Sequence, residues 1–241
     1  MLTETRDRRP YAAELKFLVP LATADAIRTW AREQLTADPH GGGVAGDEYT
    51  TTSLYSDTPD QDVYLRLGSY GRSKYRVRRY GSSDVVFLER KLRTRALLSK
   101  RRSIVAIDEL PLLEQPVADL AGWPGAWFAS RLVMRRLSPV CQVTYERTAR
   151  VTSTPYGLAR LTVDTQLAAQ VSSSWAFQSP DYRPVLTTEA IVELKFIVAM
   201  PAVFKRFIET FGLAPVTLSK YRLSAEALGI VQASIAHEVV A

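Results

Sequence analysis

Cysteine and histidine are scarce in this 241-residue chain, which carries one cysteine, Cys141, and two histidines, His40 and His237. A single cysteine cannot form an intrachain disulfide, and it cannot supply the thiolate set of a structural zinc site. Neither histidine has a partner at the spacing of a metal site or a catalytic triad. These absences exclude a disulfide-stapled scaffold, a cysteine-based zinc site and nucleophilic catalysis by a Ser–His–Asp or Cys–His set.

Long apolar runs are also missing from the sequence. No segment approaches the roughly 20 apolar residues that span a bilayer, and the charged start MLTETRDRRPY lacks the apolar region of a signal peptide. We therefore expect a soluble, cytoplasmic protein. The P-loop motif GxxxxGK[ST] is absent, so nucleotide binding of that type is not supported. No low-complexity linker interrupts the chain, and we expect one domain over residues 1–241.

Basic side chains are in surplus. Thirty-one lysines and arginines face 25 acidic residues, which gives a formal net charge of +6. This surplus favours a polyanionic partner such as nucleic acid, a phosphorylated metabolite or an anionic membrane, without choosing among them. The hydrophobic fraction of 46% is ordinary for a folded protein that buries a core.

The pattern of apolar residues predicts a mostly β protein with a few helices. Strands are expected over residues 11–19, 49–57, 72–80, 85–95, 102–110, 139–152, 158–169 and 188–198. Helices are expected from Thr23 or Asp25 to about Leu35, over 126–137 and over 200–212, with a short one near the end of the chain. The tetrapeptide ELKF occurs twice, at 14–17 and at 193–196, each time in an alternating strand that leads into an amphipathic helix.

Alternation places charged side chains on one face of most of these strands, because successive residues of a strand point to opposite sides. One parity of 72–80 collects Arg72, Lys74, Arg76 and Arg78; one parity of 85–95 collects Val85, Phe87, Glu89, Lys91 and Arg93. Similar pairs are Glu14 with Lys16, Tyr145 with Arg147, Arg160 with Asp164, and Glu193 with Lys195.

For any single strand, a solvated outer face is the simpler explanation of such a pattern. Its recurrence in nearly every strand favours the inside of a barrel instead. Like charges that face each other across strands repel, so a basic interior needs an anionic ligand or counter-ions. A polyphosphate-like ligand suits it, because arginine offers bidentate forks and lysine offers point charges.

The ordered set of charged motifs resembles the VTC domain, the polyphosphate polymerase branch of the triphosphate tunnel metalloenzymes and a relative of the CYTH proteins. The motifs are ELKF at 14–17, KYRVR at 74–78, LERK at 88–91, Lys100-Arg101, YER at 145–147, Asp164, ELK at 193–195 and SKY at 219–221. The resemblance implies an α+β fold in which an antiparallel β-barrel tunnel is surrounded by covering helices. Both ELKF strands would then line one tunnel, with Glu and Lys inward and Leu and Phe outward.

One position departs from the wider superfamily. CYTH proteins begin with Glu-x-Glu-x-Lys, and Ala12 occupies the first glutamate position here. The missing carboxylate favours the VTC branch over a two-metal hydrolase, without excluding hydrolysis.

The resemblance implies a polyphosphate polymerase that transfers the γ-phosphate of ATP onto a growing polyphosphate chain with Mn²⁺ or Mg²⁺. It assigns catalysis to Arg76, Arg78, Lys91, Arg147 and Lys195. It assigns phosphate binding to Lys16, Lys74, Lys100, Tyr145, Ser219 and Lys220. Glu193 is the expected metal ligand, and Glu14, Glu89 and Asp164 are further candidates.

The expected partners are ATP, inorganic polyphosphate, phosphate or pyrophosphate, and a membrane protein, with no nucleic acid. Two alternatives stay open: hydrolysis of triphosphate or nucleoside triphosphate in the same tunnel, and a non-catalytic module that binds polyphosphate or RNA. RNA readers expose aromatic side chains beside their basic ones. Tyr75 and Val77 fall on the parity opposite the basic residues, which disfavours RNA.

Overall fold

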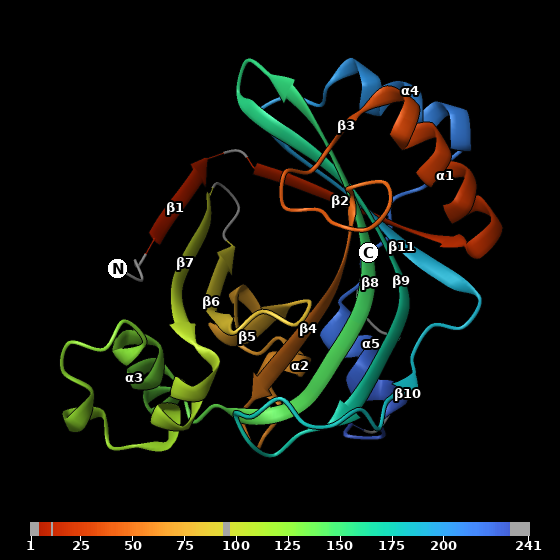
Figure 1. Ribbon diagram of the computed structural model, residues 1–241. Helices are drawn as coiled ribbons and strands as arrows, with labels where there is room; N and C mark the ends of the chain where they lie inside the picture. The colour runs from red at the N-terminus through yellow and green to blue at the C-terminus, as the bar shows by residue number, and fades with distance from the viewer. Residues whose placement is uncertain (1–4, 11, 94–96, 232–241) are drawn as a thin grey trace.

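An antiparallel sheet of eleven strands runs through most of the chain (Figure 1). The computed structural model describes residues 5–10, 12–93 and 97–231. The strand order is β1-β7-β6-β5-β4-β8-β9-β11-β2, with β3 paired to β8 and β10 paired to β9. The strands are β1 (Thr5–Pro10), β2 (Ala12–Pro20), β3 (Thr36–Ala37), β4 (Glu48–Asp57), β5 (Ser73–Tyr80), β6 (Val85–Arg93), β7 (Leu97–Ala106), β8 (Ser138–Thr154), β9 (Gly157–Val171), β10 (Arg183–Pro184) and β11 (Glu189–Ile197).

Helices lie against this sheet on its outer side and at one end. They are α1 (Leu21–Gln34), α2 (Asp62–Leu65), α3 (Ala126–Met134), α4 (Ala202–Phe211) and α5 (Lys220–Ala227), with 3₁₀ turns η1 (Tyr70–Arg72), η2 (Ile107–Glu114) and η3 (Val117–Leu120). Within the described ranges, no helix has both the length and the apolar character needed to cross a bilayer.

The first two strands give the sheet its tunnel shape. β1 and β2 are separated by a single residue, yet they stand at opposite ends of the strand order. β1 pairs with β7 and β2 pairs with β11, so one short segment holds both edges of a curled sheet. Among the described residues no ladder joins β1 to β2, and the sheet is tunnel-like rather than a fully hydrogen-bonded barrel. The predicted antiparallel tunnel with covering helices is confirmed in this form.

The two ELKF segments lie side by side. β2 and β11 are antiparallel neighbours, and their register sets Glu14 opposite Lys195 and Lys16 opposite Glu193. Because Glu-Leu-Lys read backwards is Lys-Leu-Glu, antiparallel pairing of two copies places each carboxylate opposite an ammonium group, which stabilises the pair. The repeat is therefore a self-complementary pair of strands, and the prediction that both copies line one tunnel is confirmed.

The outer face of these two strands is buried beneath α1 and α4. In α4 the aromatic residues recur at the spacing of one helix face, and Phe204 and Phe207 are fully buried. The ring of Phe207 meets that of Phe17 edge-on, with centroids 6.5 Å apart, and that of Trp30 at 5.1 Å. Gly212 ends α4 at φ 59°, a left-handed conformation that glycine adopts without strain.

A second apolar core lies between α3 and the outer face of β5, β6 and β7. Phe128 of α3 packs on Tyr75, with ring centroids 5.9 Å apart. The helix is shorter than the expected 126–137, because Arg136 adopts φ 52° and the Leu137 N–H bonds back to the Leu132 carbonyl at 2.9 Å. This closing turn is a Schellman motif, and it releases the chain into β8.

Other boundaries also differ from the sequence predictions. β7 ends at Ala106 instead of 110, because the Glu109 carboxylate accepts a bond from the Ala106 N–H at 2.7 Å and starts the 3₁₀ turn η2. Arg72 lies in η1 and is exposed, so it does not share the inner face of β5. The short strands β1, β3 and β10 had no prediction. The expected end of the 85–95 strand falls outside the described residues.

Truncating the aromatic core under α4 tests this packing. Phe207→Ala should lower the free energy of unfolding by about 3–5 kcal/mol, because a fully buried ring is replaced by a cavity. Arg206→Ala, an exposed neighbour on the same helix, should change it by less than about 0.5 kcal/mol. Urea denaturation followed by circular dichroism measures both values. Equal changes in the free energy of unfolding for the two variants would show that α4 does not cover an apolar core.

Candidate functional site

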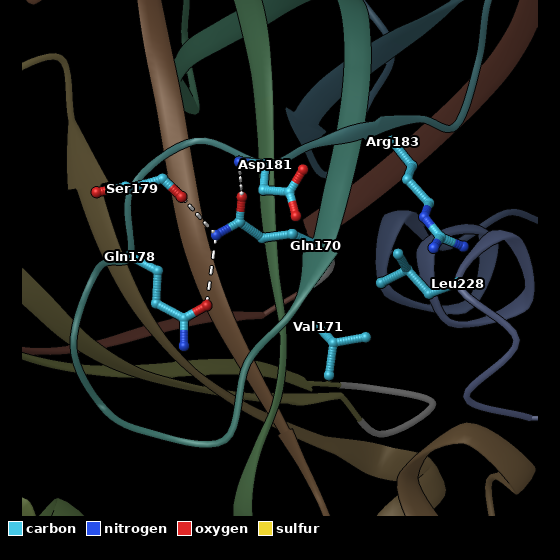
Figure 2. A pocket seen from close by; sticks show the side chains of 7 residues that line it. All are labelled: Gln170, Val171, Gln178, Ser179, Asp181, Arg183 and Leu228. Carbon is cyan, nitrogen blue, oxygen red and sulfur yellow. Dashed lines mark hydrogen bonds between the residues drawn. The ribbon is translucent and has the colours of Figure 1, made fainter.

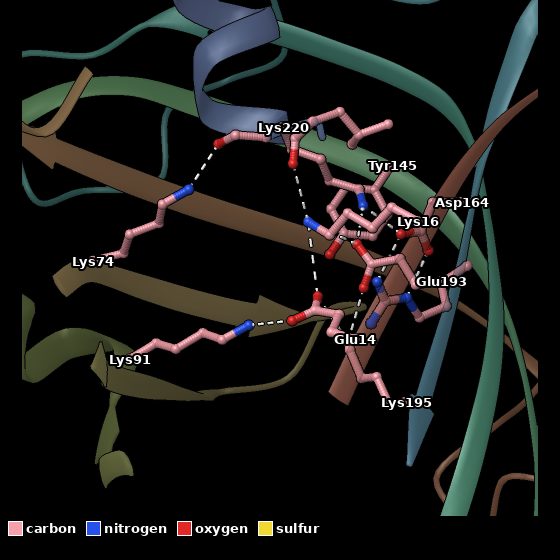
Figure 3. Close-up of polar contacts among 12 residues, drawn as sticks. Glu14, Lys16, Lys74, Lys91, Tyr145, Asp164, Glu193, Lys195 and Lys220 are labelled. Atoms are coloured by element: carbon pink, nitrogen blue, oxygen red, sulfur yellow. Dashed lines mark hydrogen bonds and ion pairs between the residues drawn. The ribbon is translucent and has the colours of Figure 1, made fainter. Parts of the chain in front are cut away.

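Charged side chains crowd the inner face of the curled sheet (Figure 3). The residues predicted for the site come from seven strands of the main sheet path and from the start of α5. They are Lys74, Arg76 and Arg78 on β5, Glu89 and Lys91 on β6, Lys100 on β7, Tyr145 and Arg147 on β8, Asp164 on β9, Glu193 and Lys195 on β11, Glu14 and Lys16 on β2, and Ser219 and Lys220 at α5. The structure brings these side chains together on one face, where most of the cations are held in groups around the carboxylates Glu14, Glu89, Asp164 and Glu193.

Glu89 is the hub of the β5–β7 side. It is 1% exposed, and its carboxylate accepts bonds from Arg76 Nε at 2.8 Å and from Arg102 Nη2 at 2.6 Å. Lys100 Nζ adds an ion pair at 2.7 Å. Burial alone would raise the pKa of Glu89, but the attraction of Arg76 and Lys100 outweighs it and holds the pKa well below its usual value. Glu89 therefore stays ionised and fixes three cations.

Arg78 is held differently from its neighbours. Its guanidinium is buried and donates to Ser53 Oγ at 3.0 Å and to Tyr145 OH at 3.2 Å. Among the described residues no carboxylate lies within ion-pair distance of it. Hydroxyl groups orient the guanidinium without neutralising it, so Arg78 keeps its positive charge available to an anion.

Asp164 organises the β8–β9 side. Arg147 binds both of its carboxylate oxygens, at 2.6 and 2.7 Å, and Lys220 Nζ lies 2.6 Å from one of them. Lys220 also donates to Glu193 at 3.1 Å. Burial alone would lower the pKa of Lys220, but the attraction of Asp164 and Glu193 outweighs it and raises the pKa. All four side chains are buried, so each charge depends on its partners.

Glu14 connects the two sides of the tunnel. Its carboxylate accepts a bond from Lys91 Nζ on β6 at 2.5 Å, across the interior from β2. Lys16 and Lys195 lie 3.7 and 3.9 Å away. Burial would raise the pKa of Glu14, as would the nearby Glu193, but the attraction of Lys195, Lys91 and Lys16 outweighs both and lowers it to about 2.

The start of α5 enters the tunnel from its end. Ser219 Oγ accepts a bond from Lys74 Nζ at 2.8 Å, and the Leu218 carbonyl accepts one from Lys16 Nζ at 3.2 Å. The helix is fixed by Tyr221, whose hydroxyl donates to the buried Asp57 carboxylate at 2.6 Å. This anchoring bond is why the SKY sequence can place Ser219 and Lys220 among the strand residues.

Lys74 stands out by its environment. Its ammonium group donates a hydrogen bond to the Ser219 hydroxyl, and among the described residues no carboxylate lies within ion-pair distance of it. Burial, together with the positive charges of Lys16, Lys91 and other nearby cations, lowers the pKa of Lys74 to about 7. A bound anion would reverse this effect.

The carboxylates do not form a metal centre of their own. Within the described residues there is no group of three or more His, Cys, Asp or Glu side chains placed to hold a metal ion. One oxygen of Glu193 faces Lys220 at 3.1 Å, and the other faces Lys195 at 2.9 Å. A divalent cation at Glu193 would therefore need further oxygen ligands from a bound phosphate. The described side chains therefore do not form a resident metal site by themselves.

Sequence reasoning missed Arg102, Tyr55 and Asp57. Arg102 shares its strand parity with Lys100, which is the signal that could have identified it. Tyr55 accepts a bond from Arg76 at 3.4 Å and stacks on Tyr221 with centroids 5.6 Å apart. No local pattern indicates that Asp57 anchors α5, because the two are joined only in the tertiary structure.

Two other features of the chain are not part of the candidate site. A surface pocket beside β9 is lined by residues including Gln170, Gln178, Asp181 and Arg183 (Figure 2). Gln170 there bonds the Ser179 carbonyl at 3.0 Å and the Asp181 N–H at 2.7 Å, so its amide holds the loop in place. The sequence GGGVAG at 41–46 has GxGxxG spacing, but it joins β3 to β4 and opens no helix, unlike a dinucleotide-binding loop.

The fold and its charged interior define a protein of the triphosphate tunnel class. A solved structure of this fold, a candidate adenylate cyclase from Bacillus halodurans, matches with a TM-score of 0.51 and 16% identity over 88% of this chain and 95% of that chain. A candidate adenylyl cyclase from Hippeastrum, described as having a dominant triphosphatase activity, matches with a TM-score of 0.47 and 15% identity over 89% and 95%. No curated protein matches in sequence.

The chain belongs to the VTC-domain family, because the family model matches residues 12–228. The resemblance inferred from the ordered motifs is thereby confirmed. The match spans the strands from β2 to β11 and the helix α5, so it includes every residue of the network described above.

Removing the Asp164 charge tests how far the buried pairs hold the fold together. Asp164→Asn should lower the free energy of unfolding by about 3–5 kcal/mol, because it leaves Arg147 and Lys220 buried without a full counter-charge. Adding Lys220→Met should recover part of this loss, since one stranded charge is then removed. The control Asp181→Asn, at an exposed carboxylate, should change stability by less than about 0.5 kcal/mol. Denaturant titration of all three variants measures the free energy of unfolding. A loss for Asp164→Asn that is no larger than that for Asp181→Asn would contradict the prediction.

Proposed function

We propose that this protein is an ATP-dependent polyphosphate polymerase, which transfers the γ-phosphate of ATP onto a growing polyphosphate chain inside the tunnel. Membership of the VTC-domain family supports an enzyme of phosphoryl transfer or triphosphate hydrolysis. The choice of the polymerase rests on the same resemblance together with the character of the inner face.

The observation that carries the proposal is the surplus of positive charge on the inner face of the sheet, where the cations are buried or half-buried. The inner face holds Lys16, Lys74, Arg76, Arg78, Lys91, Lys100, Arg102, Arg147, Lys195 and Lys220 against the carboxylates Glu14, Glu89, Asp164 and Glu193. Of the cations, Arg78 and Lys74 have only hydroxyl groups as hydrogen-bond partners among the described residues. A linear polyanion with several charges in a row matches such an interior better than a single carboxylate or phosphate does.

Phosphoryl transfer suits residues of this kind. It requires little covalent chemistry from a protein, and positioning together with charge stabilisation supplies most of the catalysis. Arg76 and Arg78 would stabilise charge on the transferring phosphoryl group, and the Tyr145 hydroxyl would help to orient it. The acceptor is a terminal phosphate that is already anionic, so the proposal needs no general base.

Proteins of the tunnel class generally use a divalent metal ion. Since the side chains present do not form a resident centre, we treat the ion as part of the substrate, the complex of ATP with Mn²⁺ or Mg²⁺. Glu193 is the carboxylate we propose to contact it, with Glu14 as its neighbour on the adjacent strand.

Incubation of the purified protein with ATP and Mn²⁺, followed by gel electrophoresis and quantification of ADP and phosphate, tests the function directly. Formation of ADP together with a ladder of long polyphosphate is the expected result. ADP with an equal amount of free phosphate and no ladder would identify a hydrolase instead. No turnover of ATP or tripolyphosphate would leave a binding module.

Arginine substitutions test the role of the interior. Arg78→Ala should lower kcat/KM for ATP by about 100-fold or more, because a preorganised cation is removed from the transferring group. Arg78→Lys should recover only part of the activity, since lysine lacks the planar fork. The exposed Arg206→Ala serves as the control and should retain full activity. Wild-type rates in a folded Arg78→Ala variant would place the reaction elsewhere.

The low pKa of Lys74, about 7, predicts a pH dependence of phosphate binding. Protonated Lys74 attracts the anion, and the anion raises the pKa of Lys74 in the complex, so its contribution to binding is full below pH 7 and declines as the pH rises above that value. The charges that face it are Lys16 from β2, Lys91 from β6, Arg66 at the end of α2 and Arg76 from β5. The ratio of wild-type to Lys74→Met affinity for tripolyphosphate, measured by calorimetry, should fall between pH 6 and pH 9.

Taking that ratio cancels the titration of the ligand itself, because both proteins bind the same ligand at each pH. A ratio that stays constant over the range would show that Lys74 does not titrate there or does not contact the anion.

A further inference from the structure

Three aromatic side chains continue the charged inner face toward one end of the tunnel. Tyr49 of β4, Tyr80 of β5 and Phe87 of β6 form a row, with ring centroids 5.6 Å apart for Tyr49–Tyr80 and 5.3 Å for Tyr80–Phe87. Tyr80 stands two residues beyond Arg78, and Phe87 stands two residues before Glu89, so strand alternation puts them on the same inner face.

These rings are not part of the apolar packing that holds the fold together. All three are partly exposed, and none of them belongs to either core cluster of the described residues. Cations lie against them instead: the Arg102 guanidinium is 4.4 Å from the Phe87 ring centre, and that of Arg78 is 5.8 Å from the Tyr80 ring centre. Burial alone would raise the pKa of Tyr80, but the attraction of Arg78 and other cations lowers it to about 8.

The opposite end of the inner face, on β5, β6 and β7, has a different character. There the register aligns Lys74 with Lys91 and Lys91 with Lys100. Along the inner face the side chains thus change from a lysine row, through the arginines and Glu89, to the aromatic row. A ligand that matches all three zones has an aromatic group at one end and anionic groups at the other.

We propose that the row of Tyr49, Tyr80 and Phe87 binds the nucleobase of a nucleoside triphosphate, with its phosphates directed toward Arg78 and Arg76. Bases stack on aromatic side chains, and nearby arginines add cation–π attraction. The inference rests on the proposed function. Because the acceptor attacks in line with the leaving group, the position of the nucleobase also sets the direction in which the acceptor chain lies. The polyphosphate acceptor then extends from the arginines toward Lys74, Lys91 and Lys100.

Equilibrium binding of ATP and of tripolyphosphate tests the subsite without requiring turnover. Phe87→Leu and Tyr80→Leu should each weaken ATP binding about tenfold, the typical cost of losing one stacked ring. The affinity for tripolyphosphate, which has no base, should stay within about twofold. Tyr80→Phe is the matched control, since it keeps the ring and removes only the hydroxyl, and it should retain ATP affinity.

A measurement on the wild type covers the case in which a variant fails to fold. The adenine H2 and H8 resonances of ATP should shift upfield on binding, because stacked rings shield them, and tripolyphosphate should displace ATP and restore their positions. An equal loss of affinity for both ligands, no loss for ATP, or unshifted adenine resonances on bound ATP overturns the nucleobase subsite alone. Failure of the wild type to bind either ligand refutes the phosphate tunnel itself, so the two proposals fail in different ways.

Discussion

Cation–carboxylate pairing inside the tunnel is the constraint on which the rest of the structure depends. Lysine and arginine side chains at this density repel one another, and taking them out of water costs further free energy. Four carboxylates offset that cost by holding the cations in groups: Glu14, Glu89, Asp164 and Glu193. They compensate the charge only in part. The interior therefore folds as a stable network and still attracts an anion, which are the two properties that a site for polyphosphate requires.

A strand period of two makes this arrangement compatible with a well-packed protein. The same strands that project charges inward project apolar residues outward, where Phe17, Leu194 and Tyr75 pack under α1, α4 and α3. Substituting one inward charge thus disturbs the site more than the core, and truncating an outward ring does the reverse. α5 is the exception, because it reaches the inner face from the end and depends on the Tyr221–Asp57 bond for its position.

Much of the fold followed from local pattern. Alternation located the long strands, helix periodicity located α1, α3 and α4, and the motifs indicated the family that the chain belongs to. Errors fell where a tertiary contact overrides local preference: α3 ends early because Arg136 takes a left-handed conformation, and β7 ends early because Glu109 caps the next turn. Strand β1 was not predicted, since its partner β7 is distant in sequence.

By itself the sequence determined which side chains share a face, and the two Glu-Leu-Lys segments determined a pair of strands that complement each other. It did not determine which face becomes the inside, or which carboxylate holds which cation. Lys91 meets Glu14 across the interior only because the sheet curls and its edges are held by β1 and β2. Arg76 and Arg102 meet on Glu89 because the registers of β5 and β7 with β6 place them on either side of it. Strand alternation is a local property of the backbone, whereas the curvature of a sheet is a sum over all its strand pairings. The curvature is therefore decided only in the tertiary structure.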